Sequence, residues 1–571
     1  MSSDDGIILG IDLGTTFSAM AYVDRHGKPV ILPNAEGQPT TPSVIHFYDR
    51  DACVVGEEAV KMVVVDALNV VRFIKRSMGE PNYTLEFFGK PYTPQELSAI
   101  ILRKLKKDAE EALGFEVKEA VVTVPAYFNS AQRGATNEAG LLAGFNVLSI
   151  INEPTAAAIS YGVERLGGDR NLLVYDLGGG TFDVTVMEIR GTTLRTIATD
   201  GNAELGGKDW DDRLLNHVAD QFVQKYGMDP RDEPQPYQEL YERCLHAKIS
   251  LSSKPRAVIP VNFRGHRTVV PVTREEFESV TRDLVEQCAD TCAIVLEKAK
   301  MRWSDIDDVL LAGGSTRMPM IQDMLRRLSS KGPVAGVNPD ECVALGASLA
   351  AVFRHRPRHP AIQAYRQALA RRPGAPGGAR PSQPGTAPLP TDPRTNPSAR
   401  SAPSFRTNPS GTPPPQSMDD GGEPQATGLP GVRITDVASH PLGIVALDAQ
   451  LRERIVTLIP EFTPLPCEKR GRFAYAYDNM TAVRVEVTEG RGETRDEVTV
   501  IGEIVLDNLP PRPRGTPIEV VYKYNLNQML EVDVTDVETR QTRRARINLR
   551  GSIAPEAMEE ARKRVATATV H

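Results

Sequence analysis

Residues 172–183, LLVYDLGGGTFD, decide the fold because a near copy stands at residues 7–18, IILGIDLGTTFS. Each copy is an apolar strand that ends in Asp-Leu-Gly, followed by a small-residue turn with threonine and by a second strand. The copies lie about 165 residues apart, as in a fold that has been duplicated. We therefore expect an α/β unit made of two similar halves.

The two turns have the composition of a phosphate-binding site. Glycine lets backbone N–H groups approach a phosphate without a Cβ in the way, and threonine adds a hydroxyl donor. Carboxylates at the strand ends can hold a hydrated Mg²⁺ ion, which prefers carboxylates, waters and phosphate oxygens. Facing turns would hold the β- and γ-phosphates of a nucleotide from both sides. The residues concerned are Asp12, Gly14, Thr15, Thr16, Asp176, Gly178, Gly179, Gly180 and Thr181.

A third glycine-rich turn, Gly313-Gly314-Ser315-Thr316-Arg317, follows an apolar strand. The glycines suit the close approach of a flat base, and the guanidinium plane of Arg317 can stack on it. The chain has neither a Walker A loop nor a GxGxxG fingerprint, because Gly206-Gly207-Lys208 has the wrong spacing and precedes an aspartate. The three turns together predict a nucleotide site of another kind.

Composition excludes several other classes of protein. The 571 residues include 67 Lys and Arg against 74 Asp and Glu, a net charge of −7 that does not suggest a nucleic-acid binder. There is no run of about 18 apolar residues, and the acidic start Met1-Ser2-Ser3-Asp4-Asp5 is unlike a secretory signal. Six cysteines are too few for a disulfide framework. We expect a cytoplasmic protein that binds no membrane and no nucleic acid.

Between residues 356 and 430 the apolar periodicity stops. Residues 371–430 contain 15 prolines in 60 positions, mixed with glycine, serine and threonine. Such a segment cannot bury enough surface to offset its chain entropy, so we predict a disordered tether. Residues 354–406 also carry ten arginines against one acid, Asp392. Two functions therefore stay open for it, a soluble linker or a docking segment for an anionic partner.

Helices are expected before the tether. Apolar residues at helical spacing predict a helix over 95–113 that ends at Gly114, and a similar pattern covers 274–301. Cys288 and Cys292 share one face of the second pattern. Because no further ligands of matching spacing accompany them, we expect core thiols rather than a metal site.

Strands are expected after the tether. Residues 481–488, 517–524 and 530–537 alternate between apolar and polar side chains, which predicts an antiparallel β domain. One short helical pattern at 555–566 follows.

Five motifs carry a resemblance to a known family. In order they are IDLGTTFSA (11–19), VTVPAYFNSAQR (122–133), INEPTAAAISYG (151–162), VYDLGGGTFDVTV (174–186) and LLAGGSTRMPMI (310–321). They resemble the heat shock protein 70 (DnaK-type) chaperones, closely over 4–355 and more loosely over 432–560. The resemblance implies an α/β actin/hexokinase-like ATPase domain with duplicated RNase H-like halves at 4–355. It further implies a linker at 356–430, an antiparallel β-sandwich that binds peptide at 431–552, and a short helix, the remnant of a lid, at 553–571.

The resemblance also implies catalytic roles at matching positions. Lys75 is similar to a lysine near the γ-phosphate, and Glu153 to a carboxylate that positions the attacking water. The carboxylates that would organise Mg²⁺, mostly through water, are Asp12, Asp176 and Asp183, with K⁺ as a further candidate ion. These types of residue suit the reaction. Phosphoryl transfer needs a positive charge near the phosphate oxygens, on which negative charge develops, and a water molecule oriented for attack.

Further positions match the family's nucleotide pocket and its signalling. Pro125 and Arg133 match a relay that reports the nucleotide state to the other domain. The pocket for ATP or ADP is matched by Gly206, Gly207, Lys248, Ser252, Gly313, Gly314, Ser315, Arg317 and Asp340.

Two departures from the family pattern concern ligands. Leu245 stands where the family usually has a glutamate that bonds the ribose, so we expect ATP to bind about fivefold more weakly, one hydrogen bond being worth ~1 kcal/mol. Ser130 and Ser149 replace an aspartate and an arginine on the surface that J-domain co-chaperones contact. Losing the arginine removes a charge-assisted contact, so a standard J-protein should fit poorly.

Two further departures concern the C-terminal region. Arg433-Ile434-Thr435 stands where the family's apolar linker has leucines. A tether of ~75 residues instead of about ten lowers the effective concentration of the sandwich at the ATPase domain about 20-fold. This decrease corresponds to about 1.8 kcal/mol of lost interdomain coupling. We therefore expect weak coupling between peptide and ATP, and fast peptide exchange because the lid is nearly absent. The groove residues by alignment, for which a role in the sandwich core is equally open, are Ile444, Leu447, Phe473, Ala476, Val483, Val485 and Met529.

Two functions from different classes remain. The leading one is a DnaK-type chaperone that hydrolyses ATP to ADP and phosphate and transiently binds exposed apolar peptide segments. The alternative is a nucleotide-switched adaptor for one specific partner, which the altered linker and missing lid favour. An actin-like or sugar-kinase enzyme shares the phosphate turns but lacks the later motifs. We expect a monomer, with a J-domain co-chaperone and a nucleotide exchange factor as candidate partners.

Overall fold

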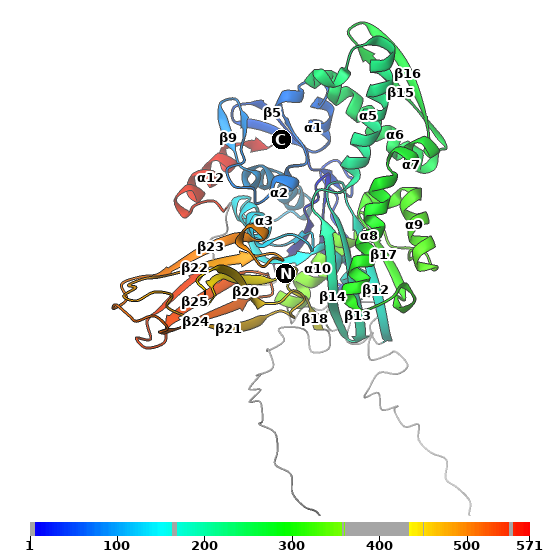
Figure 1. Cartoon of the computed structure of the whole chain (residues 1–571). Helices are drawn as coiled ribbons and strands as arrows, with labels where there is room; N and C mark the ends of the chain where they lie inside the picture. Colours follow the sequence, from blue (N-terminus) through cyan, green and yellow to red (C-terminus); the bar gives the residue numbers. More distant parts are fainter. Residues whose placement is uncertain are drawn as a thin grey trace, which may run out of the picture.

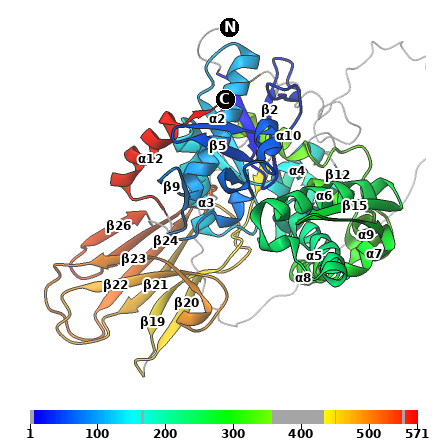
Figure 2. The same cartoon turned by 90° about the horizontal axis from the view of Figure 1, so that it is seen from above.

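The computed structural model describes residues 6–162, 168–356, 359, 362, 433–448, 450–546 and 552–570. The expected tether therefore lies outside the described residues except for three positions. The described chain forms an N-terminal unit of sheets and helices and a C-terminal sandwich of strands that lies against it (Figures 1 and 2). No helix among the described residues is long and apolar enough to cross a membrane.

Each half of the N-terminal unit contains the same kind of sheet. The strand order is β11-β10-β1-β2-β3 in the first half and β17-β12-β13-β14-β18 in the second. β1 pairs antiparallel with β2 and parallel with β10, just as β12 pairs antiparallel with β13 and parallel with β17. The predicted duplication is confirmed. The strands are β1 (Ile8–Asp12), β2 (Phe17–Val23), β3 (Pro29–Ile31), β10 (Glu119–Val124), β11 (Asn146–Asn152), β12 (Gly168–Leu177), β13 (Phe182–Gly191), β14 (Thr193–Asn202), β17 (Asp308–Ala312) and β18 (Arg433–Thr435).

Two helices join the halves. α10 (Cys342–His355) packs on α4 (Glu153–Gly162) and on β1. A glycine at Gly346 is required there, because a Cβ would lie 1.7 Å from the carbonyl oxygen of Ala156. The buried cluster around these helices draws residues from both sheets. The cleft between the halves is therefore closed at its base.

Other elements of the N-terminal unit surround the two sheets. The helices are α1 (Glu57–Met62), α2 (Pro94–Leu113), α3 (Ser130–Leu142), α5 (Gly207–Tyr226), α6 (Pro234–Ser253), α7 (Arg274–Val280), α8 (Arg282–Ala299) and α9 (Pro319–Ser329). The short strands are β4 (Thr41–Pro42), β5 (Ile45–Asp49), β6 (Ala52–Val55), β7 (Val70–Val71), β8 (Leu85–Phe87), β9 (Lys90–Tyr92), β15 (Arg256–Phe263) and β16 (His266–Thr273).

The helix expected over 95–113 is present and its boundaries have clear causes. α2 begins with a capping box between Thr93 and Glu96 and ends at Gly114, whose φ is 77°. The pattern over 274–301 is instead divided into α7 and α8 at Thr281. The Thr281 hydroxyl donates to the Phe277 carbonyl at 2.8 Å, a local side-chain bond that competes with helical continuation.

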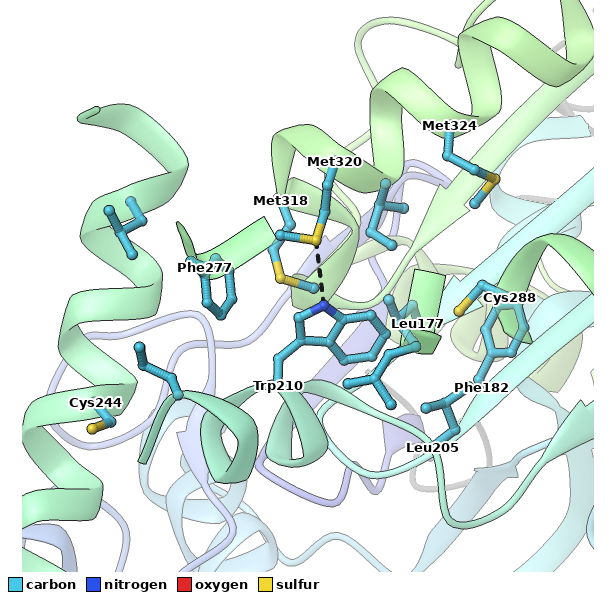
Figure 3. Close-up of a cluster of buried hydrophobic side chains, with 14 of the residues drawn as sticks. Leu177, Phe182, Leu205, Trp210, Cys244, Phe277, Cys288, Met318, Met320 and Met324 are labelled. Atoms are coloured by element: carbon cyan, nitrogen blue, oxygen red, sulfur yellow. Dashed lines mark hydrogen bonds between the residues drawn. The ribbon is translucent and has the colours of Figure 1, made fainter. Parts of the chain in front are cut away.

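The core of the second half lies directly under one phosphate turn. Figure 3 shows Trp210 of α5 at its centre, with its indole N–H donating to the Met320 sulfur at 3.4 Å. Cys288 and Cys292 are fully buried in the same cluster. Among the described residues no group of three or more His, Cys, Asp or Glu side chains could hold a metal by itself. The expected structural role of both thiols agrees with this placement.

The predicted antiparallel β domain is present as two four-stranded sheets. Their orders are β20-β19-β22-β23 and β21-β24-β25-β26, and their apolar faces share one core. The alternation expected for 481–488 is confirmed, since Val483, Val485 and Val487 are buried while Arg484 is exposed. The strands are β19 (Leu442–Leu447), β20 (Glu453–Ile459), β21 (Cys467–Ala474), β22 (Val483–Glu489), β23 (Thr499–Leu506), β24 (Pro517–Tyr524), β25 (Leu530–Asp536) and β26 (Thr542–Arg546).

The segment after the tether adds a strand to the second half of the N-terminal unit. β18 pairs in parallel with β14, and Ile434 packs against the buried cluster between the halves. Asp436 then accepts hydrogen bonds from the hydroxyls of Thr155 and Thr196 at 3.2 and 3.0 Å. The expectation of weak coupling rested in part on the leucines missing at Arg433 and Thr435, and this docking removes that part of its basis. Docking here uses main-chain pairing, which does not need leucine side chains.

The C-terminal helix packs on the N-terminal unit. α12 (Pro555–Thr567) contacts α2 and α3 (Figure 1), and β27 (Thr569–Val570) pairs in parallel with β6. Ala561 and Val565 are buried in the core of the first half. Arg564 of α12 forms an ion pair at 2.7 Å with Glu96, which is fully buried. The expected lid remnant is thus a helix, but its apolar face covers the first half.

A charged substitution on the buried face of α12 should detach it. Val565→Asp would bury an unpaired carboxylate, and we expect it to lower the free energy of unfolding of this region by about 3 kcal/mol. Ala566→Asp is the matched control, because Ala566 is exposed on the same helix. Hydrogen exchange of residues 555–570 measures the effect. Equal exchange in the two variants would show that α12 contributes no buried contact.

Candidate functional site

A cavity of about 440 Å³ lies between the two halves of the N-terminal unit. It is lined by residues from both sheets and from α6 and α10, so it is the place where the expected site residues can meet. Those of the predicted residues that line it are Asp12, Gly14, Thr15, Thr16, Lys75, Glu153, Asp176, Gly178, Gly179, Thr181, Gly207, Lys248, Ser252, Gly313, Gly314, Ser315, Arg317 and Asp340.

The two phosphate turns face each other in the cavity. A Cβ at Gly179 would lie 1.5 Å from the Thr16 hydroxyl, and one at Gly180 would lie 2.4 Å from the Thr15 methyl. Glycine is therefore required where the second turn meets the first. Gly180 and Gly206 were expected to contact the nucleotide but do not line the cavity. They touch each other behind it, since a Cβ at Gly206 would lie 2.5 Å from the Gly180 nitrogen.

A lysine and a group of carboxylates meet at one end of the cavity. Lys75 Nζ lies 2.6 Å from Glu153 Oε1, and both side chains are buried. Burial and the nearby Glu153 charge raise the pKa of Asp12 to about 7. The same causes raise the pKa of Asp176 well above its usual range. One lysine faces three close carboxylates, so a further positive charge would stabilise this group.

Asp183 is oriented differently from the expectation. Its Oδ2 accepts the Ala126 N–H at 3.1 Å and its Oδ1 accepts the Tyr127 N–H at 3.2 Å. It is opposite Asp176 in the β12–β13 hairpin but does not line the cavity. Burial followed by Glu153 raises the pKa of Asp183 to about 7. In this arrangement both oxygens of Asp183 bond the loop at 125–128, and its role at Mg²⁺ through water stays a prediction.

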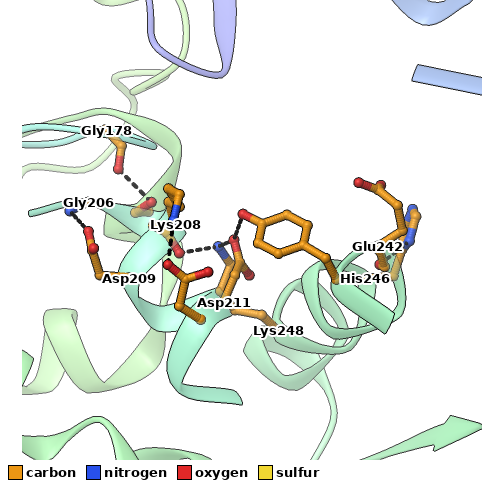
Figure 4. Close-up of polar contacts among 12 residues, drawn as sticks. Gly178, Gly206, Lys208, Asp209, Asp211, Glu242, His246 and Lys248 are labelled. Carbon is orange, nitrogen blue, oxygen red and sulfur yellow. Dashed lines mark hydrogen bonds and ion pairs between the residues drawn. The ribbon is translucent and has the colours of Figure 1, made fainter. Parts of the chain in front are cut away.

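The other end of the cavity is lined by α6 and by the third glycine-rich turn. Figure 4 shows Lys248 of α6 reaching the start of α5, where it donates to the Gly207 carbonyl at 2.9 Å and to Asp211 Oδ2 at 2.8 Å. The Ser315 hydroxyl donates to the Gly178 carbonyl at 2.8 Å, which ties the third turn to the phosphate turn. Arg317 is half exposed and pairs with Asp340 at 2.5 Å, so its guanidinium plane stands at the rim.

Leu245 lines the cavity beside Lys248. Changing Leu245 to glutamate is expected to tighten ATP binding about fivefold, because one added hydrogen bond to the sugar contributes ~1 kcal/mol. Calorimetric titration of both proteins with ATP measures the change. Titration with 2′,3′-dideoxy-ATP is the control, since this analogue offers no hydroxyl. An equal gain for both nucleotides would contradict a bond to the sugar.

Several residues at the cavity were not identified from the sequence. Phe73 has a φ of 59° and lines the cavity from the first half, while Asp211 holds Lys248 from the second. Arg76 donates to the Gly180 carbonyl at 2.9 Å and pairs with Asp209. The signal that could have found Arg76 is its position directly after Lys75.

Two positions expected on a partner-binding surface are buried in the structure. Ser130 is 2% exposed and contacts Glu489 of the sandwich, and Ser149 is 3% exposed and lies 3.2 Å from the His355 ring. The docked sandwich covers the first position and α10 covers the second. Neither is therefore accessible to a J-domain in this arrangement.

The residues expected to line the peptide groove differ in their burial. Ile444, Val483 and Val485 are buried in the sandwich core, where they fill the space between the sheets, so their assignment to an open groove is not supported. Leu447 is 39% exposed. The remaining candidates, Phe473, Ala476 and Met529, are half-buried.

Comparison with known proteins covers nearly the whole chain. The family model described as Hsp70 protein matches residues 8–86, 80–358 and 425–569. A "Chaperone protein DnaK" of Thermosipho africanus (strain TCF52B) is 37% identical over 546 residues, which are 94% of this chain and 79% of the relative. The protein of the same name from Thermosipho melanesiensis is 38% identical over 94% of this chain and 80% of its own length. That from Thermotoga neapolitana is 37% identical over 94% and 79%.

Proposed function

This chain belongs to the Hsp70 family and is an ATP-dependent chaperone of the DnaK type, and on that premise we propose that ATP is hydrolysed in the cavity between the two halves. The observation that carries the proposal is the buried contact of 2.6 Å between Lys75 and Glu153 beside Asp12 and Asp176. An ATPase needs a cation at the transferred phosphoryl group and a carboxylate at the attacking water. The N-terminal unit, residues 6–355, is called the ATPase domain below.

The residues present fit a Mg²⁺ ion that is bound mostly through water and phosphate. Asp12 and Asp176 line the cavity, and their mutual repulsion is among the causes that raise the pKa of Asp176. Too few carboxylates converge to hold an ion without water or phosphate. The ion would supply positive charge to the β- and γ-phosphates. K⁺ stays a further candidate.

The residues of the chain itself perform three tasks in this proposal. Backbone N–H groups and hydroxyls of the facing turns bind the phosphates. Lys75 stabilises negative charge that develops in the transition state, and Glu153 orients the water. Lys248, Ser252 and Arg317 bind the adenosine. Pro125 and Arg133 relay the state of the site to the sandwich.

The sandwich is proposed to bind exposed apolar peptide segments. Leu447, Phe473, Ala476 and Met529 support this role because they are apolar and part of each side chain stays accessible. We further propose a cytoplasmic location, since all six cysteines are free in the structure, and a monomeric state. Its co-chaperones would include a nucleotide exchange factor and a J-domain protein that binds without Ser130 and Ser149.

One experiment separates this function from that of an adaptor. ATP turnover is measured with and without an apolar extended peptide, in Mg²⁺ and in excess chelator. We expect slow turnover that requires Mg²⁺ and rises with peptide. Turnover that peptide leaves unchanged would favour the adaptor, and no turnover at all would contradict the proposed site.

A further inference from the structure

Each carbonyl of the glycine run in the second phosphate turn, residues 178–180, accepts a hydrogen bond. The Gly178 carbonyl accepts the Ser315 hydroxyl at 2.8 Å and the Gly207 N–H at 2.9 Å. The Gly179 carbonyl accepts the Lys208 N–H at 2.9 Å. These donors all belong to the second half of the ATPase domain. The first two peptide planes of the run are therefore fixed within that half.

The third carbonyl is held from the other half. Arg76 Nε donates to the Gly180 carbonyl at 2.9 Å, and the Arg76 side chain is 18% exposed. The same guanidinium pairs with Asp209, which accepts the Gly206 N–H at 2.7 Å at the start of α5 (Figure 4). Arg76 does not line the ATP cavity. A charged donor of the first half thus holds the last peptide of the run from outside the cavity.

This contact determines where the next N–H group points. The C=O and N–H groups of a planar trans peptide point in opposite directions. Because Arg76 holds the Gly180 carbonyl from outside the cavity and Thr181 lines the cavity, the Thr181 N–H is directed toward the cavity. Among the described residues no backbone carbonyl accepts this N–H. Hydrogen bonds in series polarise one another, so the guanidinium also makes the N–H a stronger donor.

A short helix of the first half places Arg76 next to the catalytic lysine. Both residues lie in the 3₁₀ helix η2 (Ile74–Ser77), which begins after Phe73. Phe73 has a φ of 59°, a left-handed conformation that is uncommon for an aromatic residue and is typical of functional sites. From this turn Lys75 reaches Glu153, and Arg76 reaches the phosphate turn. One turn of helix therefore directs two consecutive cations to different parts of the site.

We infer that Arg76 is a positioning residue for ATP hydrolysis, which orients the 180–181 peptide so that the Thr181 N–H can donate to a phosphate oxygen. The inference rests on the proposed ATPase site. Without Arg76 the peptide is free to rotate, and a carbonyl turned toward the phosphates would repel them. A preorganised donor matters most where negative charge develops in the transition state. Loss of Arg76 should therefore slow hydrolysis more than it weakens ATP binding.

Two variants and a matched control test the contact. Arg76→Ala removes the donor, and Arg76→Lys keeps a cation that can donate to the same carbonyl. Arg72→Ala is the control, because Arg72 is 11% exposed, pairs with Glu242 of the second half and does not line the ATP cavity. It removes an ion pair between the halves without touching the phosphate turn.

Four measurements are made on each protein. Hydrogen exchange of residues 178–183 in the nucleotide-free protein reports the order of the turn. Single-turnover hydrolysis gives the rate of the chemical step, and calorimetric titration gives the affinity for ATP. Thermal unfolding verifies that each variant is folded.

In Arg76→Ala we expect faster exchange of residues 178–183 and hydrolysis slowed about 30-fold, less than the 10²–10³-fold typical for loss of a direct donor. ATP affinity should stay within about threefold, since the other donors of the turns remain. Arg76→Lys should recover most of the rate. Arg72→Ala should match the unmodified protein in exchange and in rate.

Three results would overturn the inference. They are an unchanged rate in Arg76→Ala, a lysine variant no faster than the alanine variant, and an Arg72→Ala protein as slow as Arg76→Ala. The last result would mean that ion pairing between the halves, and not the orientation of one peptide, sets the rate. An unmodified protein without any hydrolysis would instead overturn the proposed function, and the exchange of residues 178–183 would still test whether Arg76 holds the turn.

Discussion

Replacing Lys75 with alanine is expected to slow ATP hydrolysis by about 10²–10³-fold while ATP binding changes by less than about threefold. Removal of one preorganised donor to a developing oxyanion typically has an effect of that size. Lys75 is suited to this role because it is buried and its Nζ lies 2.6 Å from Glu153 Oε1, beside the phosphate turns. Most of the proposed contacts to the base, the sugar and the phosphates of ATP come from other residues. The rate of the chemical step should therefore fall, and the affinity should not.

The measurement is single-turnover hydrolysis combined with calorimetric ATP binding. Lys104→Ala is the matched control, because Lys104 is equally buried, bonds Asp108 at 2.7 Å within α2, and does not line the cavity. It removes a comparable ion pair and should reduce stability without slowing the chemical step. Wild-type turnover in Lys75→Ala would contradict the assignment of the cavity as the catalytic site.

Replacing Arg433 with proline is expected to remove most of the effect of peptide on hydrolysis. Proline has no N–H, whereas the Arg433 N–H donates to the Thr192 carbonyl at 3.0 Å where β18 begins to pair with β14. Couplings between two sites are typically ~1–3 kcal/mol, which corresponds to about 5–150-fold in an affinity. A coupling in that range can persist in this chain because β18 docks despite the long tether.

The ratio of ATP turnover with and without saturating peptide measures this loss. Arg433→Ala is the control, since Arg433 is exposed and its side chain is not needed for main-chain pairing. We expect Arg433→Ala to keep the full ratio and Arg433→Pro to approach a ratio of one. A full ratio in Arg433→Pro would mean that the sandwich signals through contacts other than β18.

Sequence predicted the parts of the site that are encoded locally. Each phosphate turn is a short run of glycine and threonine, and Lys75 and Glu153 stand in recognisable motifs, so their convergence in one cavity could be expected. Asp183 has the same kind of motif, yet its orientation depends on two amides 56 and 57 residues away. Such a long-range choice of partner leaves no pattern in the sequence.

The placement of the C-terminal elements could not be predicted because an apolar face does not specify the surface that covers it. The apolar face of α12 predicts a helix that buries one side, but it does not say against which surface. The same holds for Ile444, Val483 and Val485, because an alternating strand has one apolar face whether it meets the opposite sheet or a peptide. Only the docked structure distinguishes these cases.

The pairing of β18 with β14 has a consequence for how such linkers diverge between relatives. Strand addition uses main-chain N–H and C=O groups, so the exposed side chain of Arg433 can be exchanged without loss of the pairing. Substitution should be felt instead at Ile434, through packing, and at Asp436, through its bonds to two buried threonines. A search for a run of leucines would miss this linker, although the segment still joins the sandwich to the second half.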